Sequence, residues 1–205
     1  MLITSRVEDR RQLSMLVWSF DEPMTVASTA ACGGGLGERR WIINAQVQHD
    51  YRRRDQQRHG AELAAVAGVA EAGGVVMFTA LDVSRVRSAQ DGGVHVDATV
   101  GLTLPVWAAA PDVGVAAAPG TVNLMAQLPV RLSDAALLNA LCTVTEAKTQ
   151  ALLEAGIPGT GTASDAVTIV CRIDGPAEQF GGPRSTWGAR LARAVHAAVL
   201  AGTQR

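Results

Sequence analysis

The stretch "SDAALLNALCTVTEAKTQALLEAGIPGTGTASDAVTIVCRI", residues 133–173, decides the fold because it places a long helix, a short polar loop and a strand in succession. Ser133 is a suitable N-cap residue, and a helical pattern follows it as far as residue 155. Gly156 and Pro158 stop that helix. The loop at 159–165 mixes glycine with hydroxyl residues, and the valine-rich run at 166–173 predicts a strand.

Outside this stretch, short apolar runs predict further strands at 13–20, 24–30, 41–47, 75–81, 94–104 and 122–130. The alanine-rich segment "GAELAAVAGVAEAGG" predicts a helix that ends near Ala72, and an amphipathic helix is expected from Ser185 onward. Strands come first and helices gather toward the C-terminus. This order favours an α+β or mixed α/β fold, a single-domain layered fold with several strands and C-terminal helices.

Composition sets the broad class. Of the 205 residues 48% are apolar and 18% are charged, which excludes general disorder, and without a visible linker we expect one domain over 1–205. The net charge of −1 gives no electrostatic case for nucleic acid or for an anionic membrane surface. The cluster Arg52–Arg54 with Arg58 is interpreted as a solvated loop or helix face.

The three cysteines, Cys32, Cys142 and Cys171, are far apart and lack CxxC spacing, so neither a disulfide framework nor a structural zinc site is indicated. A reducing cytoplasm fits best. The N-terminus lacks the order of a secretory signal, and no segment has the apolar length of a membrane span. The sequence leaves open whether the protein forms a homo-oligomer.

Two charges lie on the long predicted helix. Glu146 and Lys148 are expected at the edge of a buried stripe, where a charge is costly unless it has a partner or a task. The alternative is that Glu146 is solvated and that the Lys148 stem covers the stripe while its ammonium reaches water.

The loop after this helix can present backbone N–H groups to a ligand or to an oxyanion. It is not a P-loop, because it has no GK[ST] and leads into a strand. A plain turn, in which Asp165 bonds to local backbone, is the alternative. The residues concerned are Gly159, Thr160, Gly161, Thr162, Ala163, Ser164 and Asp165.

Four blocks taken together resemble the adenosylcobinamide amidohydrolase family of corrinoid salvage enzymes. They are "PGTVNLMAQLPVRLSDAALLNAL", "TEAKTQALLEAG", "GTGTASDAV" and "FGGPRSTWGARLARAVHAAV", within residues 119–199. A looser similarity extends through "DATVGLTLPVWAAAP" and "STAACGGGL". The resemblance implies an amidohydrolase-like domain that cleaves the amide between aminopropanol and the corrin ring of adenosylcobinamide. Adenosylcobyric acid and aminopropanol would be the products, with the corrinoid as substrate. The sequence itself shows no motif that requires a cofactor or a metal.

Two mechanisms suit these residues. In the first, Glu146 is the general base for water, Lys148 and the N–H groups of the loop stabilise the oxyanion, and Asp165 orients the loop. In the second, the hydroxyl of Thr162 or Ser164 is the nucleophile and Lys148 is its base. No GxSxG elbow accompanies either hydroxyl, so the second ranks lower.

Other residues have two interpretations each. Asn123 either bonds a corrin amide or satisfies nearby backbone, and Arg184 either assists a ligand at the last helix or stands beside an ordinary cap formed by Ser185. Backbone is expected to approach the corrin at Gly33, Gly34 and Gly35 and at the loop 159–165. Structural or surface roles are favoured over metal binding for His49, His59 and the pair His95 and Asp97.

Two competing functions remain at this point. A non-catalytic corrinoid carrier would have the same pocket without a base, although the chain lacks the DxHxxG setting of cobalamin carriers. The second competing function is that of a related hydrolase that acts on another amide.

Overall fold

The computed structural model describes residues 1–70, 73–111 and 120–204. Its strands form an eight-stranded mixed sheet in the order β4-β3-β2-β8-β7-β6-β5, with β1 paired to β2 off this path. The strands are β1 (Leu2–Glu8), β2 (Arg11–Ser28), β3 (Gly35–Gln46), β4 (Gly74–Thr79), β5 (Arg87–Asp91), β6 (Val94–Gly101), β7 (Thr121–Gln127) and β8 (Ala166–Cys171). The helices are α1 (Gln56–Val66), the 3₁₀ turn Val83–Arg85, α2 (Asp134–Glu154) and α3 (Thr186–Thr203).

The long strand β2 makes the sheet turn over on itself. Its pairing with β3 shifts register between Ser19 and Met24. Before the shift β2 pairs with β1, and after it, from Thr25 to Ser28, it pairs with β8. One strand therefore belongs to both halves of the sheet, and the two halves lie face to face.

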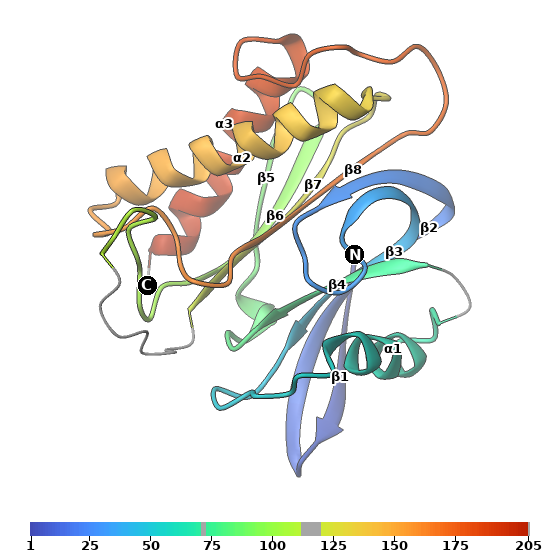
Figure 1. Ribbon diagram of the computed structural model, residues 1–205, viewed down its shortest axis with the longest axis vertical. Helices are drawn as coiled ribbons and strands as arrows, with labels where there is room; N and C mark the ends of the chain where they lie inside the picture. Colours follow the sequence, from blue (N-terminus) through green and yellow to red (C-terminus); the bar gives the residue numbers. More distant parts are fainter. Residues whose placement is uncertain (71–72, 112–119, 205) are drawn as a thin grey trace.

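The chain is arranged in four layers, helix, sheet, sheet and helix. The core between the sheet halves joins β2, β3 and β4 to β7 and β8, for example Leu16 and Ile42 with Met125 and Val170. Figure 1 shows α2 and α3 side by side over β5 to β8, and α1 beside β3 and β4 at the other side of the molecule. The helices thus cover the outer face of each half of the sheet, while β1 leaves most of its side chains exposed.

Two crossovers place a helix between parallel strands: α1 joins β3 to β4, and α2 joins β7 to β8. The other strand pairs are antiparallel. Ser133 caps α2 by accepting a hydrogen bond from the Ala136 N–H, and Ser185 caps α3 in the same way through Gly188. Both caps agree with the sequence.

The structure confirms the α+β or mixed class and corrects several boundaries. The runs at 13–20 and 24–30 form one bent strand, and the strand expected to reach residue 104 ends at Gly101. Strands β1 and β5 were missed because most of their side chains are exposed or half-buried and their pattern is weak. Helix α1 ends at Val66, whereas Ala72, the expected end, lies outside the described residues. None of the helices in the described part of the chain has the length and apolar character to cross a bilayer.

Gly68 ends α1 early because it takes a left-handed conformation, with φ of 73°. Its N–H donates to the Ala65 carbonyl, and the Val69 N–H donates to that of Ala64, which is the Schellman arrangement. We expect Gly68→Ala to lower the free energy of unfolding by about 1 kcal/mol, because an L side chain disfavours positive φ.

The matched control is Gly73→Ala, since a Cβ at either position meets no atom within 4 Å and only Gly68 has the left-handed φ. Urea unfolding of both variants checks the prediction. Equal losses of stability would contradict this account of how the helix ends.

Candidate active site

Asp165 is the centre of the loop that joins α2 to β8. Its Oδ1 accepts hydrogen bonds from the Val122 N–H at 2.8 Å and from the Thr162 hydroxyl at 2.5 Å. Its Oδ2 accepts from the Thr162 N–H at 3.1 Å and from the Lys148 ammonium at 2.5 Å. The carboxylate therefore fastens the loop to the start of β7 and to α2.

Lys148 is buried beneath this loop, with 6% of its surface exposed. Its ion pair with Asp165 supplies the partner that a buried charge requires. A side chain at Gly161 would collide with both the Asp165 carboxylate and the Lys148 ammonium. The glycine is therefore needed for the close passage of the loop over the ion pair.

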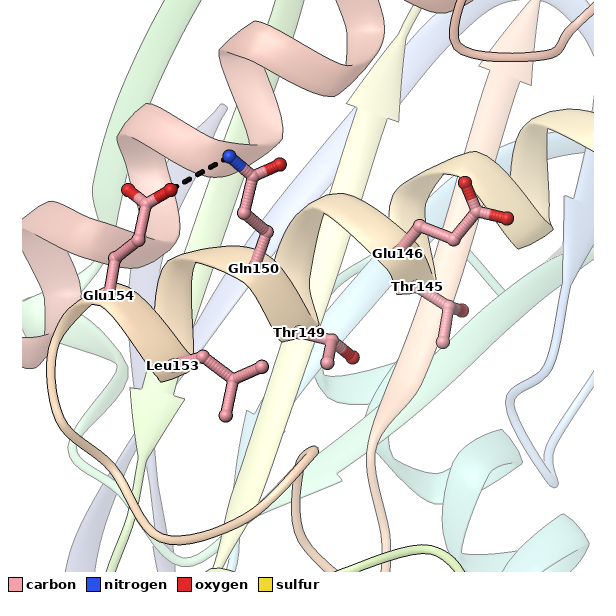
Figure 2. A pocket seen from close by; sticks show the side chains of 6 residues that line it. All are labelled: Thr145, Glu146, Thr149, Gln150, Leu153 and Glu154. Atoms are coloured by element: carbon pink, nitrogen blue, oxygen red, sulfur yellow. Dashed lines mark hydrogen bonds between the residues drawn. The ribbon is translucent and has the colours of Figure 1, made fainter.

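The first mechanism requires Glu146 and Lys148 to face the same site, and the structure does not place them so. Figure 2 shows Glu146 on the outer side of α2, in a row with Thr149, Gln150 and Leu153. Glu146 is exposed, whereas Lys148 points inward. Successive residues of a helix are about 100° apart around its axis. Two residues separated by one other, as Glu146 and Lys148 are, therefore point to nearly opposite sides.

A cavity of about 490 Å³ lies between the two crossovers. Its walls come from the carboxyl end of β4, the amino ends of β7 and β8, and the segments that follow β2 and β3. The segment after β3 contributes the polar side chains Gln48, His49, Tyr51 and Gln56. Besides the Tyr51 phenol, hydroxyl groups come from Thr29, Thr79, Thr121 and Ser164.

Ser164 is the predicted hydroxyl that reaches this cavity. It is exposed, its Oγ lies 2.8 Å from the Thr121 Oγ1, and it can donate to the Gly120 carbonyl at 3.1 Å. Thr162 instead bonds to Asp165 and, at 2.7 Å, to the Gly120 carbonyl. Lys148 donates to Asp165, so the expected pairing of Lys148 with either hydroxyl is not found.

The rest of the loop faces away from the cavity walls. The Thr160 N–H donates to the Val106 carbonyl, and the Thr160 hydroxyl accepts from the Ala108 N–H. A side chain at Gly159 would press on the backbone of Val106. The substrate contacts expected at Gly159, Thr160 and Gly161 are therefore replaced by packing within the protein. Within the loop, residues 163–165 line the cavity.

Other expected substrate contacts are also placed elsewhere. Gly33 packs on the backbone of Gly74, Gly34 and Gly35 continue this turn, and the Arg39 guanidinium donates to the Gly33 carbonyl. None of the three glycines lines the cavity. Arg184 is exposed beside the Ser185 cap, in a turn that packs on the first turns of α2 and so lies far from the loop after α2.

Asn123 has the structural role that was one of its two interpretations, because it bonds to nearby backbone. Its amide N–H₂ donates to the Phe78 carbonyl at 3.0 Å and to the Asn44 Oδ1 at 2.9 Å, and the residue is 1% exposed. It joins β7 to β3 and β4 across the space between the sheets. It does not line the cavity, so the predicted contact with a corrin amide is not supported.

An aromatic cluster that the sequence did not reveal forms part of the wall. Tyr51 and Phe78 line the cavity, and His59 stacks on both with ring centroids 5.4–5.5 Å away. The Tyr51 hydroxyl lies 2.9 Å from the His59 Nδ1, and the His59 Nε2 lies 3.5 Å from Oε2 of Glu8. His59 is 2% exposed.

The charged side chains around this cluster form ion pairs. Arg6 donates through Nε and Nη2 to Glu8. In the arginine cluster, Arg53 pairs with Asp55 and Glu62 at 2.7 Å each, consistent with a solvated, ion-paired face. Burial lowers the pKa of His59, which Arg53 and Arg6 also lower and Glu8 raises. Burial raises the pKa of Tyr51.

Metal ligation has little support in these residues. Across the described ranges no three His, Cys, Asp or Glu side chains are grouped so as to hold an ion. His95 pairs with Asp97 at 3.0 Å, and Asp97 also accepts from the Trp18 indole and the Ser88 hydroxyl. That pair therefore belongs to the contacts between the sheet halves.

Together, these features define an α+β protein in four layers, with a cavity between its crossovers that both polar and apolar side chains line. The family model for adenosylcobinamide amidohydrolase matches residues 2–205, so the chain belongs to that family and the resemblance found in the sequence is confirmed.

Two relatives carry the same family name. The adenosylcobinamide amidohydrolase of Halobacterium salinarum is 39% identical over 133 residues, which cover 62% of this chain and 57% of that protein. That of Methanosarcina mazei is 27% identical over 187 residues, which cover 87% of this chain and 90% of that protein. The match to the first relative thus spans little more than half of its length.

The ion pair can be tested by a double-mutant cycle. We expect Lys148→Met and Asp165→Asn each to lower the free energy of unfolding by about 3 kcal/mol, because each leaves a buried charge without its partner. The double variant should lose less than the sum, because it removes both charges. Urea unfolding measures all three, with the exposed Glu146→Gln as control. Strictly additive losses would show that the two groups do not interact.

Stability should also depend on His59. A histidine whose pKa is lowered by folding binds its proton more readily when unfolded, so stability is full above the ordinary pKa of 6.5 and falls as the pH drops below it. We expect His59→Gln to flatten this fall between pH 7.5 and pH 5.5, measured as the slope of unfolding free energy against pH. An unchanged slope would mean that His59 does not titrate differently on folding.

Proposed function

We propose that this chain hydrolyses the amide of adenosylcobinamide that joins aminopropanol to the corrin ring, giving adenosylcobyric acid and aminopropanol. Family membership along residues 2–205 supports this class of reaction. The observation that carries the assignment to a site is the cavity between the crossovers, which includes the family-like block at 163–166. The proposal treats 1–205 as one amidohydrolase-like domain.

The cavity suits one part of the substrate. Its volume of about 490 Å³ is in the range of small-molecule sites but smaller than a whole corrinoid. We therefore place the aminopropanol arm and its amide inside, with the ring over the mouth. The side-chain amides of Gln48 and Gln56 match the peripheral carboxamides of the corrin as donors and acceptors.

The hydroxyl pair is the proposed site for the oxyanion. Ser164 and Thr121 share one hydrogen bond at the wall, and a hydroxyl that turns from the Gly120 carbonyl toward the substrate can donate to the developing negative charge. Neither hydroxyl is bonded to a base, so water is the proposed nucleophile. Lys148 and Asp165 keep the loop in place beneath it.

Amide hydrolysis changes no oxidation state, so the proposal includes no redox cofactor. A corrinoid is the proposed small-molecule partner, and the proposal involves neither nucleic acid nor a membrane. A cytoplasmic location and the oligomeric state stay predictions.

Product analysis tests the assignment. Purified protein is incubated with adenosylcobinamide and, separately, with unrelated small amides, each with and without a chelator, and cobyric acid is sought by chromatography. We expect product from the corrinoid alone. Binding without product would favour a carrier, and product from the other amides alone would favour a different hydrolase. Loss of activity with chelator would show a metal requirement.

Two variants test the placement of the site. Ser164→Ala should lower kcat about 100-fold, because it removes one donor to the oxyanion. Glu146→Gln should keep kcat within about twofold of the wild type, because its carboxylate lies on the outer face of α2. Steady-state rates with both proteins shown to be folded decide this, and the reverse pattern would move the site to the outer face of the helix.

A further inference from the structure

We propose that Tyr51 is a catalytic acid–base residue of this cavity, and that its hydroxyl passes protons between the attacking water and the departing amine through His59, which Glu8 orients. This inference rests on the proposed amide hydrolysis and adds the proton-transfer group that Ser164 and Lys148 do not supply.

The first support is the order of the three groups from the cavity inward. Tyr51 lines the cavity, its hydroxyl is 2.9 Å from the His59 Nδ1, and the opposite ring nitrogen of His59 is 3.5 Å from Glu8. A carboxylate, an imidazole and a hydroxyl in this order are the arrangement by which hydrolases activate a hydroxyl group. Here a phenol stands where those enzymes have a serine.

The second support is the tautomer that these contacts select. Because a carboxylate accepts hydrogen bonds and does not donate them, the 3.5 Å contact between the His59 Nε2 and the Glu8 Oε2 favours the tautomer that carries its proton on Nε2. Nδ1 then has a free electron pair and accepts the Tyr51 O–H. The phenol oxygen keeps its own electron pairs for a water molecule in the cavity.

The third support is that the parts are held in place. Phe78 and His59 stack on Tyr51 with ring centroids 5.6 Å and 5.5 Å away. Arg6 holds the Glu8 carboxylate at 2.9 Å and 2.6 Å and donates to the Gln46 carbonyl. The stacked rings therefore fix Tyr51 at one end of the relay, and the Arg6 guanidinium fixes Glu8 at the other end.

The directions of the pKa shifts of His59 and Tyr51 also agree with these roles. Burial lowers the pKa of His59, helped by Arg53 and Arg6 and opposed by Glu8. Burial raises the pKa of Tyr51, with Arg53 lowering it and Asp55, Glu8 and Cys32 raising it. At neutral pH the imidazole is therefore a neutral acceptor and the phenol keeps its proton.

The proton steps balance with water alone. As the water oxygen bonds to the amide carbon, its proton moves to the Tyr51 oxygen while the Tyr51 proton moves to the His59 Nδ1. The imidazolium so formed is stabilised by Glu8. When the carbon–nitrogen bond breaks, the proton returns from His59 through Tyr51 to the amine nitrogen. A carboxylic acid and an amine leave, and the relay is restored.

Tyr51→Phe is the main test, because it keeps the ring stack and removes only the hydroxyl. We expect kcat for adenosylcobinamide to fall about 100-fold with KM changed by less than about threefold. The wild type should lose kcat/KM as the pH falls and His59 takes a proton, and the residual rate of Tyr51→Phe should lack this dependence. The positioning residues are tested by His59→Gln and Glu8→Gln, which should also lower kcat.

The matched control is His196→Gln, which removes another histidine–glutamate contact, at 2.7 Å to Glu154, on the helical layer. It should keep the wild-type rate and pH profile.

A second readout does not depend on turnover. Tyr51 is the single tyrosine of the chain, so 3-fluorotyrosine labelling gives one ¹⁹F signal. This signal should titrate with His59 in the wild type, stay flat over the same pH range in His59→Gln, and shift when adenosylcobinamide is added.

The outcomes separate the two claims. A wild type that forms no product overturns the proposed function and this inference with it. Product from the wild type together with an unchanged kcat in Tyr51→Phe overturns the inference alone. A ¹⁹F signal that ignores both His59 and the corrinoid also overturns it.

Discussion

The ion pair between the Lys148 ammonium and the Asp165 carboxylate is the contact on which the arrangement of the site depends. Through it α2 holds the loop, and through the Val122 N–H the same carboxylate holds the start of β7. Ser164 stands directly before Asp165 in the chain, so its place at the cavity wall follows from this anchor. A buried charge pair is costly to form, but breaking it is costlier, and this makes the loop position well defined.

Much of this local architecture could be predicted from the sequence, because its determinants are local. The caps of α2 and α3, the stop at Gly156 and the strand after the loop all follow from nearest neighbours. The direction of the charged side chains could not be predicted, since the sequence did not show which side of α2 meets the sheet. The structure turns Lys148 toward Asp165 and leaves Glu146 outside. The glycine and threonine residues of the loop 159–165 likewise indicated a ligand site. In the structure, most of them pack against other parts of the protein.

The aromatic relay was beyond sequence reasoning for a different reason. Tyr51 and His59 are eight positions apart, but Glu8 comes from β1, and pairing between distant segments leaves no local pattern. His59 is buried near the start of α1, but it follows the arginine cluster Arg52–Arg54 in a polar stretch that has the composition of a solvated surface segment. The available signal was the lone tyrosine beside polar residues after a buried strand, which by itself did not distinguish a functional group from an ordinary loop residue.

Hydrogen bonds between the two halves of the sheet hold one wall of this cavity. Asn44, Thr99 and Asn123 form a chain of side-chain hydrogen bonds between β3, β6 and β7, and Asn123 also holds the Phe78 carbonyl. These buried hydrogen bonds join the two halves of the sheet, whereas the Asn123 Oδ1 has no hydrogen-bond partner among the described residues. Phe78 is in turn the residue on which Tyr51 stacks. The same contacts that close the interior thus hold the aromatic wall, and the chemical groups come from segments fastened to a rigid frame. In the proposed site, groups held by such a frame would be oriented before substrate arrives, which is the condition for electrostatic stabilisation of a transition state.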